Sequence, residues 1–453
     1  MKKFGLIVIG AGSGLNVSSA AADKGIKVAV VENGPMGGTC LNRGCIPSKM
    51  LIHSADVAEI IKSSKKFGIE SKINKINFRK IVDRVSKIVD KDAKGIEEGI
   101  KADKNTTLYK TEGKFVGFKT LKVGKETITA DKIVIAAGTR PFIPKIEGLS
   151  DVDFITSDGA LRLKKLPKTM TVIGGGYIAA ELAHFFGSLG AKITIIQHNE
   201  LLVPNEDIEI AEKFTEIFRK KYNVLLGYNA VKVSRKGKNF VVIAEKNGKK
   251  KKIISEQLLV AAGRIPNTDI LDVKKTDVRI NDRGFVNVNE FMETNVKGVW
   301  ALGDIAGKFL FKHSANLEAN YVYNNIFHEK RKIDYRAMPH AIFTSPQIAG
   351  VGYTERELKE KKISYAIGKY SYMNTGMGLA LQDKDGFVKI LAHKKTRKIL
   401  GCHIIGTDAS TLIQEVIVAM KSGNGTVDNI RNAVHVHPAL SEVVQRAVND
   451  IEL

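Results

Sequence analysis

The stretch FGLIVIGAGSG at residues 4–14 decides the fold, because it reads as a short apolar strand that ends in a glycine turn. An alanine-rich segment follows it, and KVAVVE at 27–32 then reads as a second strand. This order predicts a βαβ unit. A glycine turn at the start of a helix lets backbone N–H groups approach a pyrophosphate, whose charge the helix N-terminus favours. The stretch therefore predicts a dinucleotide-binding fold.

The details of this first turn support the interpretation, with one irregularity. Gly10, Gly12 and Gly14 form the turn, and Glu32 lies 22 positions after Gly10, where an acid is suited to accept from a ribose hydroxyl. The third glycine of the usual G-x-G-x-x-G pattern is replaced by Leu15, so we infer a one-residue deletion near it. We expect nucleotide binding to survive, because the first two glycines make the turn, and helix–strand packing to differ.

The same pattern returns in the second third of the chain. Residues 170–173 read as a strand, 174–176 as a glycine turn, 177–189 as a helix and 192–196 as a strand. Each unit is followed by a strand with a similar ending, IVIAAGTRP at 133–141 and LLVAAGRIPN at 258–267. A repeated supersecondary unit indicates a duplicated ancestor or two bound dinucleotides.

The second unit lacks the acid of the first. Its last strand ends in Gln197 and His198, whereas a carboxylate there would select NAD and repel a 2′-phosphate. A protonated His198 would help to bind that phosphate. The pattern favours NADPH weakly and leaves the use of both nicotinamides open.

The remaining chain predicts a third α/β unit. Segments 54–66 and 78–100 read as amphipathic helices. From about residue 336 the pattern changes to alternating strands, followed by helices near 408–422 and 439–449. A length of 453 residues is consistent with about three domains of ~150 residues each.

Two of the three cysteines lie in the most informative segment, GGTCLNRGCIPSK at 37–49. Cys40 and Cys45, five positions apart before a predicted helix, can come within disulfide distance. A helix N-terminus and nearby cations would lower a thiol pKa. The alternatives are a zinc site, for which a second ligand pair is missing, or two buried free thiols. Cys402 stands alone in a strand pattern, and we interpret it as an inert core residue.

Composition narrows the class of protein. Three cysteines are too few for a disulfide-stapled secreted scaffold, and no apolar run approaches the ~20 residues that span a bilayer. We therefore predict a cytoplasmic protein. The net charge of +23 indicates a lysine-rich solvated surface, or attraction of acidic substrates or an acidic partner protein. The run Lys249–Lys252 reads as a hairpin tip. Aromatic residues are not interleaved with basic ones, so nucleic-acid binding is not expected.

Four motifs resemble the pyridine nucleotide-disulfide oxidoreductases, the flavoenzyme family that includes dihydrolipoamide dehydrogenase, glutathione reductase, mycothione reductase and mercuric reductase. Residues 37–49 resemble the redox motif of the family, and GGGYIAAE at 174–181 resembles its NAD(P)H-binding motif. ALGD at 301–304 resembles the second FAD motif, and HVHPALSE at 435–442 the catalytic ending. The resemblance covers essentially the whole chain.

The resemblance implies a glutathione reductase-like α/β fold with two Rossmann-like domains and a C-terminal α/β dimerisation domain. Residues 1–150 and 273–335 would form a discontinuous FAD-binding and central domain. Residues 151–272 would bind NAD(P)H, and residues 336–453 would form the interface of a homodimer. FAD and NAD(P)H are the implied cofactors, and no metal is implied.

The resemblance also implies roles for individual residues. Cys45 would face the flavin as the charge-transfer thiolate, and Cys40 would exchange with the substrate. His437 of the partner subunit, oriented by Glu442, would be the acid–base, a role suited to histidine near neutral pH. The other implied catalytic residues are Lys49 and Glu181, which would pair beside the flavin. The implied FAD contacts are Gly10, Gly12, Gly14, Glu32, Thr39, Lys49, Gly113, Gly138, Asp304 and His313. The implied NAD(P)H contacts are Gly174, Gly176, Tyr177, Gln197, His198, Gly263 and Arg264, and Tyr177 would gate the nicotinamide pocket.

The motifs favour a dihydrolipoamide dehydrogenase, which acts on a small-molecule or lipoyl-protein dithiol, with a 2-oxoacid dehydrogenase complex as a possible partner. An NADPH-dependent reductase of a low-molecular-weight disulfide is the second interpretation, because the missing third glycine and Gln197 resemble mycothione reductase. A non-catalytic flavoprotein scaffold and a flavin oxidase are further alternatives. Arg43, between the two cysteines, is either a solvated charge or a site for an anionic thiol substrate. The direction of the reaction depends on redox potentials that the sequence does not reveal.

Overall fold

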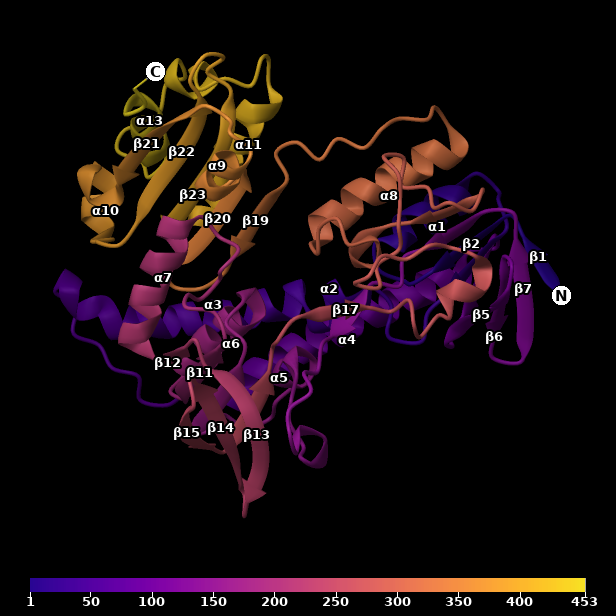
Figure 1. Cartoon of the computed structure of the whole chain (residues 1–453), viewed down its shortest axis with the longest axis horizontal. Helices are drawn as coiled ribbons and strands as arrows, with labels where there is room; N and C mark the ends of the chain where they lie inside the picture. The colour runs from indigo at the N-terminus through magenta and orange to yellow at the C-terminus, as the bar shows by residue number, and fades with distance from the viewer. Residues whose placement is uncertain (453) are drawn as a thin grey trace.

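The computed structural model describes residues 1–452 and arranges the chain in three lobes (Figure 1). One lobe contains a five-stranded parallel sheet with the strand order β18-β8-β2-β3-β4. All four residues of β2 are buried, as expected where helices cover both faces of a parallel sheet. The strand β18, from far along the chain, pairs with β8 and returns the chain to this sheet. The strands are β2 (Leu6–Ile9), β3 (Val28–Val31), β4 (Thr106–Tyr109), β8 (Ile133–Ile135) and β18 (Val299–Ala301).

A second parallel sheet has the strand order β12-β11-β10-β16. Beside it, an antiparallel sheet of β13, β14 and β15 extends away from the other lobes (Figure 1). The parallel strands are β10 (Thr169–Ile173), β11 (Lys192–Gln197), β12 (Asn223–Leu226) and β16 (Gln257–Val260). The antiparallel strands are β13 (Asn229–Lys236), β14 (Asn239–Lys246) and β15 (Lys249–Ser255).

The first glycines of the two units occupy equivalent positions. Gly10 has φ of +105° and Gly174 has φ of +114°. A Cβ on Gly10 would come 2.3 Å from the carbonyl oxygen of Ala136, and a Cβ on Gly174 would come 2.3 Å from that of Ala261. Both positions therefore require glycine for the backbone conformation and for the close approach. The two repeated endings also meet, because β9 (Thr139–Pro141) pairs with β17 (Arg264–Pro266).

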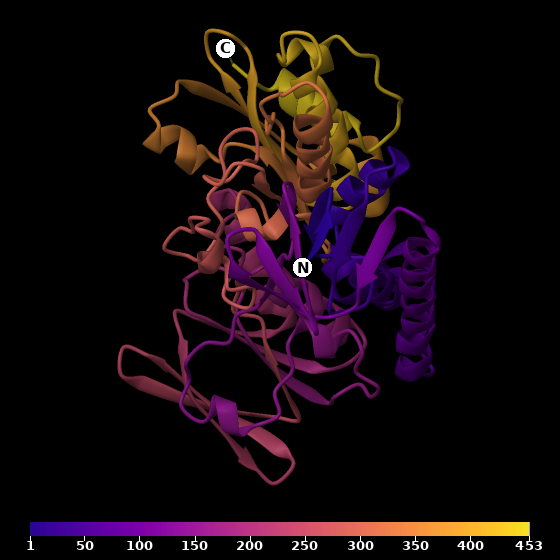
Figure 2. The same ribbon diagram turned by 90° about the vertical axis from the view of Figure 1, so that its right-hand side faces the viewer.

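The third lobe is an antiparallel sheet with the strand order β19-β20-β23-β22-β21. It is coloured orange to yellow and lies together at the top of the molecule in both views (Figures 1 and 2). Its strands are β19 (Pro339–Ile342), β20 (Gln347–Gly352), β21 (Tyr365–Ser371), β22 (Phe387–His393) and β23 (Ile399–Gly406). A smaller sheet flanks the first lobe and consists of β1 (Lys2–Phe4), β5 (Gly113–Gly117), β6 (Thr120–Val123) and β7 (Glu126–Ala130).

The helices cover these sheets and connect the lobes. The long helices α3 and α4 carry their buried residues toward the shared core with α6. The α-helices are α1 (Gly14–Asp23), α2 (Gly38–Arg43), α3 (Cys45–Ser63), α4 (Phe78–Ala102), α5 (Ser157–Ala160), α6 (Tyr177–Ser188), α7 (Ile208–Lys221), α8 (Lys312–Phe327), α9 (Glu355–Glu360), α10 (Gly376–Leu381), α11 (Ala409–Lys421), α12 (Asp428–Arg431) and α13 (Glu442–Asn449). The 3₁₀ helices are η1 (Ser64–Phe67), η2 (Leu149–Asp151), η3 (Val273–Thr276), η4 (Gly303–Ala306) and η5 (Tyr372–Asn374).

Several local expectations need correction. The lysine run predicted as a hairpin tip forms the start of strand β15, and the turn is Asn247-Gly248, whose φ angles of +50° and +76° suit those two residue types. The helix expected over 54–66 begins at Cys45 and ends at Ser63. Cys402 is fully buried in β23, as the sequence predicts.

The helix α1 approaches the first sheet closely at Gly14. A Cβ on Gly14 would come 2.8 Å from Val8 of β2 and 3.0 Å from Ala136. This glycine therefore permits the close approach of α1 to the sheet, and Leu15 packs against the core one position later. Among residues 1–452, no helix is both long and apolar enough to cross a membrane.

Candidate active site

A cavity of about 530 Å³ lies at the carboxyl ends of the first sheet and extends to α3 and α6. Ligands bind at this edge of open α/β sheets because the loops and helix N-termini meet there. Most of the residues predicted for FAD, and all but His437 and Glu442 of those predicted for catalysis, line it. The lining residues predicted from the sequence are Gly10, Gly12, Glu32, Thr39, Cys40, Cys45, Lys49, Gly138, Tyr177, Glu181, Arg264 and Asp304.

The entrance to α1 fits a dinucleotide. A Cβ on Gly12 would come no closer than 3.9 Å to any other group, so the turn leaves open space beside its backbone. Glu32 accepts hydrogen bonds from the backbone N–H groups of Ala11 at 2.8 Å and Gly34 at 2.7 Å. These bonds hold the carboxylate at the cavity wall, where it would reach a ribose hydroxyl. The residues present therefore fit the adenosine side of FAD.

A second polar group lines the same cavity at the start of η4. Thr139 donates to Asp304 at 2.8 Å and accepts from the guanidinium of Arg264 at 2.7 Å. Burial raises the pKa of Asp304, although Thr139 and Arg264 act against this rise. Arg264 was predicted to contact NAD(P)H, but its guanidinium points to Thr139 and Asp304. These three residues would hold the ribityl side of FAD.

The two cysteines are free thiols in adjoining helices. Cys40 lies within α2, and Cys45 is the first residue of α3, with only Gly44 between the helices. A hydrogen bond from Cys40 lowers the pKa of Cys45 to about 7, with help from Lys49 and against the effect of burial. The same contact, together with burial, raises the pKa of Cys40 far above its usual range. Cys45 is therefore the more acidic of the two thiols.

Among residues 1–452, no group of three or more His, Cys, Asp or Glu side chains is placed to hold a metal ion.

Lys49 and Glu181 join three parts of the chain beside Cys45. The Nζ of Lys49 lies 2.8 Å from both carboxylate oxygens of Glu181, and Glu181 also accepts from the backbone N–H of Phe343 at 3.0 Å. The ammonium group lies 4.6 Å from the centre of the Phe343 ring. The pair thus connects α3, α6 and the segment after β19.

His437 and Glu442 are paired but lie outside the cavity. The Nδ1 of His437 lies 3.0 Å from an oxygen of Glu442, at the start of α13, and the hydrogen bond lowers the pKa of Glu442. The His437 side chain is 76% exposed, whereas that of Glu442 is 9% exposed. Val434 and Val436 beside it are 100% and 75% exposed. An oriented imidazole in an exposed apolar segment is suited to meet a second subunit.

Other predicted site residues lie away from this cavity. Gly113 packs in β5, where a Cβ would come 3.0 Å from Val31, and His313 bonds to the carbonyl of Pro339 at 2.8 Å. Gln197 is buried and bonds to its neighbours, whereas His198 is exposed. Gly176, in the turn before α6, and Gly263, after β16, both border open space, since a Cβ on either would meet nothing within 4 Å.

Two cations of the cavity were not assigned there from the sequence. Lys312, at the start of α8, donates to Ser13 at 2.8 Å, and Coulombic interactions link it to both cysteines. In the sequence, only its position shortly after the ALGD motif points to it. Arg43 lines the cavity, where it lies 3.6 Å from Asp158 with its side chain 42% exposed.

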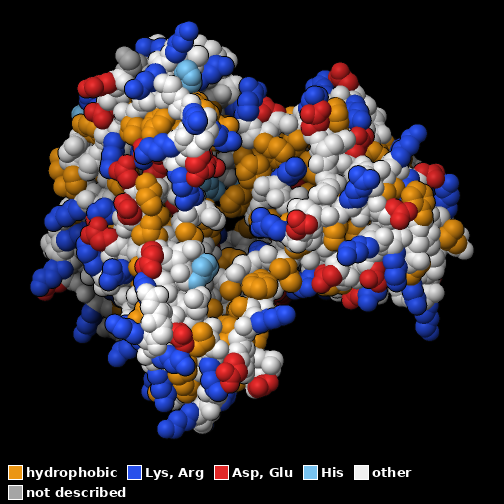
Figure 3. Space-filling view, viewed as in Figure 1, with side chains coloured by type: hydrophobic (Ala, Val, Ile, Leu, Met, Phe, Trp, Pro, Cys, Tyr) orange, Lys and Arg blue, Asp and Glu red, His pale blue; other side chains and the backbone are white. Residues whose placement is uncertain are grey.

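Basic residues on the face of the molecule shown in Figure 3 do not form a single patch. On the face shown in Figure 3, lysine and arginine side chains are spread over all three lobes and alternate with acidic ones. The basic residues on this face are therefore not gathered at one ligand site.

Comparison with known proteins gives consistent results. Residues 4–324 match the family described as pyridine nucleotide-disulphide oxidoreductase, and residues 338–448 match the dimerisation domain of that family. Mycothione reductase of Mycobacterium tuberculosis is 36% identical over 99% of both chains. Dihydrolipoyl dehydrogenase of Cupriavidus necator is 36% identical over 98% of this chain and 97% of that protein. The HOCl-induced flavoprotein disulfide reductase RclA from Escherichia coli is 26% identical, with a TM-score of 0.87 over 99% of both chains.

Proposed function

Because the chain belongs to the pyridine nucleotide-disulphide oxidoreductase family, whose members use FAD and NAD(P)H, we propose that it transfers two electrons between NAD(P)H and a dithiol/disulfide substrate through Cys40 and Cys45. The observation that carries this proposal is the pair of thiols at the cavity wall, in which a hydrogen bond from Cys40 lowers the pKa of Cys45. We further propose that the substrate is dihydrolipoamide.

The chain would hold FAD along the cavity. Gly10, Gly12 and Glu32 would bind the adenosine and pyrophosphate, and Thr139 and Asp304 would bind the ribityl chain. When bound, FAD supplies two-electron transfer between the nicotinamide and the sulfur atoms. Lys49 and Glu181 would fix α3 against α6, which keeps Cys45 at the cavity wall.

The sulfur chemistry balances through two exchange steps. In the reducing direction, the sulfur of Cys40 attacks the substrate disulfide, a mixed disulfide forms, and one substrate thiol leaves. The thiolate of Cys45 then attacks Cys40, so the second substrate thiol leaves and the Cys40–Cys45 disulfide forms. Two electrons from NAD(P)H and two protons restore the dithiol. Oxidation of a substrate dithiol runs these steps in reverse.

The proton steps need an acid–base that titrates near neutral pH, and no histidine is among the residues that line this cavity. His437 would take the proton of Cys40 and return it to the leaving thiolate, because imidazole can do both near neutral pH. The exposed position of His437 supports delivery of this residue into the cavity of the partner subunit of a homodimer. Glu442 would fix the orientation of the imidazole.

Two candidate substrates follow from different observations. The HVHP motif and the dihydrolipoyl dehydrogenase relatives support dihydrolipoamide, free or on a lipoyl protein of a 2-oxoacid dehydrogenase complex. The absence of a carboxylate at Gln197 and the mycothione reductase relative support an NADPH-dependent reductase of a small disulfide.

Steady-state assays separate these candidates. The value of kcat/KM is measured in both directions. In the oxidising direction the substrate is dihydrolipoamide with NAD⁺ or NADP⁺. In the reducing direction NADH or NADPH is combined with mycothione disulfide, glutathione disulfide or lipoamide. We expect dihydrolipoamide to give the highest value. A higher value for a small disulfide with NADPH would favour the reductase, and turnover of none of these substrates would contradict the proposed function.

A further inference from the structure

The hydroxyl of Tyr177 is held by a buried carboxylate from outside its own helix. Tyr177, the first residue of α6, lines the cavity and donates a hydrogen bond to Glu206, which is 3% exposed. The other carboxylate oxygen of Glu206 lies 2.8 Å from the Nε2 of His340 in β19. Hydrogen bonds thus join three residues from separate segments of the chain: Tyr177, Glu206 and His340.

The ring of Tyr177 is also fixed in orientation. It is nearly parallel to the ring of His340, with centres 6.1 Å apart and planes 17° apart. It is equally aligned with Phe311, with centres 6.3 Å apart and planes 16° apart. The hydroxyl and both ring neighbours therefore define a single position for this side chain at the cavity wall.

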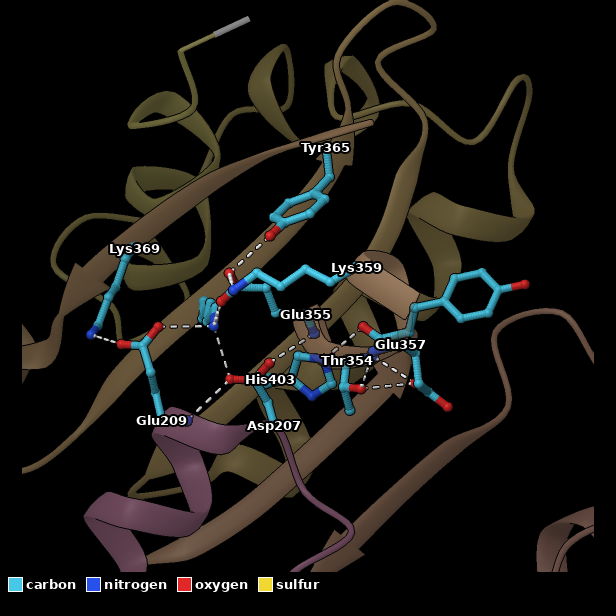
Figure 4. Close-up of polar contacts among 11 residues, drawn as sticks. Asp207, Glu209, Thr354, Glu355, Glu357, Lys359, Tyr365, Lys369 and His403 are labelled. Carbon is cyan, nitrogen blue, oxygen red and sulfur yellow. Dashed lines mark hydrogen bonds and ion pairs between the residues drawn. The ribbon is translucent and has the colours of Figure 1, made fainter. Parts of the chain in front are cut away.

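The residue next to Glu206 belongs to the charge cluster in Figure 4, which includes Asp207, Glu209 and Glu355. Asp207 is the N-cap of α7 and lies 2.9 Å from the Nζ of Lys389, a lysine with no exposed surface. That ammonium also lies 2.6 Å from Glu355 and 2.8 Å from Glu209. Lys389 and Glu355 belong to the C-terminal lobe, whereas α7 precedes β12 of the second sheet. The cluster therefore fastens the start of α7, and Glu206 with it, to the C-terminal lobe.

Gly350 has no side chain and therefore leaves room for His340. Gly350 in β20 lies between His340 in β19 and His403 in β23. A Cβ there would come 2.5 Å from the His340 ring and 3.1 Å from His403.

Burial alone would raise the pKa of Glu206, but His340 and Tyr177 keep it below its usual value, so the carboxylate is ionised. A hydrogen bond to an ionised acceptor is stronger than a neutral one.

We propose that Glu206 and His340 are positioning residues that latch Tyr177 over the nicotinamide pocket, so that NAD(P)H must break the Tyr177–Glu206 hydrogen bond to reach the flavin. This inference rests on the proposed function and adds to it an anchor in the C-terminal lobe. The latch acts on entry of the nucleotide and leaves hydride transfer unaffected once the nucleotide is bound.

The test uses the FAD-loaded protein and follows flavin reduction in an anaerobic stopped-flow instrument at increasing NADH or NADPH concentration. Tyr177→Phe removes one buried oxygen and keeps the ring, so it retains the fold. We expect the apparent Kd for the nucleotide to fall about 10-fold, as loss of a charge-assisted hydrogen bond implies. The limiting rate should stay within about twofold. Glu206→Gln should shift the Kd in the same direction.

The double variant Tyr177→Phe/Glu206→Gln should bind no more tightly than Tyr177→Phe, because both substitutions break one contact. Tyr365→Phe is the matched control: it removes a tyrosine–glutamate hydrogen bond of 2.9 Å to Glu355 within the same cluster and should leave the Kd unchanged. An unchanged or higher Kd in Tyr177→Phe, or additive effects in the double variant, would overturn the latch alone. A wild-type flavin that neither nucleotide reduces would overturn the proposed function together with the latch.

Discussion

Lys49 and Glu181 form a two-oxygen ion pair, with the ammonium 2.8 Å from each carboxylate oxygen, although they lie 132 positions apart in the chain. Lys49 lies one helical turn beyond Cys45 in α3, and Glu181 lies in α6. The hydrogen bond from Cys40 has the largest effect on the pKa of Cys45. Lys49 lowers that pKa further, whereas Glu181 raises it by a smaller amount.

Replacing Lys49 should therefore raise the pKa of Cys45. In the wild-type dithiol that pKa is lowered from 9.0 to about 7, so Cys45 is a thiolate above about pH 7 and becomes protonated as the pH falls through that value. In Lys49→Met the midpoint should move up by about one pH unit or more. The measurement is the rate of alkylation of Cys45 against pH, followed by peptide mass spectrometry. Lys94→Met, an exposed lysine on α4, is the control, and an identical midpoint in Lys49→Met would contradict this role.

Substitutions of Cys40 and Cys402 should have different effects on turnover and stability. Cys40→Ser should retain FAD and its reduction by NAD(P)H and lose disulfide turnover by at least about 1,000-fold, because a hydroxyl does not replace the exchanging sulfur. Cys402→Ala should keep turnover within about twofold and lower the free energy of unfolding by about 1 kcal/mol, because Cys402 is buried away from the cavity. Turnover in Cys40→Ser near the wild-type value would remove Cys40 from the reaction.

A site shared between subunits can be tested by complementation. Cys40→Ser and His437→Gln homodimers should each have little activity. In a hybrid dimer, the His437→Gln chain supplies the cysteines and the Cys40→Ser chain supplies His437 to the same cavity. Co-expression should therefore restore about a quarter of wild-type activity, since half of randomly assembled dimers contain one complete site. If no activity returns in purified, doubly tagged hybrids, His437 acts within its own chain or not at all.

The two glycines of the second turn should have separable effects. Gly174→Ala forces a side chain into a φ of +114° and against a carbonyl at 2.3 Å, so it should lower the free energy of unfolding by about 3 kcal/mol. Gly176→Ala meets nothing within 4 Å, so the fold should keep its stability. Its methyl group would occupy the space of an approaching nucleotide and raise the Kd for NAD(P)H. Denaturant unfolding and nucleotide titration measure the two effects, and equal stability losses would contradict the distinction.

The features that the sequence predicts well are those set by short spacing. Gly10 and Gly174 follow buried strands directly, and Cys40 and Cys45 are joined by a single helical turn and Gly44. Local patterns of this kind determine backbone conformation without help from distant residues. The lysine run lies in β15 and not at the hairpin tip, because the Asn247-Gly248 pair, a strong hairpin signal, forms the turn.

The contacts that escaped prediction depend on packing between distant segments. Glu206 and His340 are 134 positions apart, and their bond requires the C-terminal sheet to lie against the start of α7. Lys389 reads as an ordinary surface lysine in sequence, yet it has no exposed surface because three carboxylates surround it. The contact of Arg43 with Asp158, more than a hundred residues away, is of the same kind.

Thiol trapping during anaerobic reduction tests the central claim most directly. The oxidised, FAD-loaded protein is mixed with excess NADPH or NADH without substrate, and free thiols are alkylated and identified by mass spectrometry as the flavin absorbance is followed. We expect Cys40 and Cys45 to change from unlabelled to labelled as the nucleotide is consumed, while Cys402 remains unlabelled. Nucleotide oxidation that leaves these two cysteines in their starting state would contradict the account.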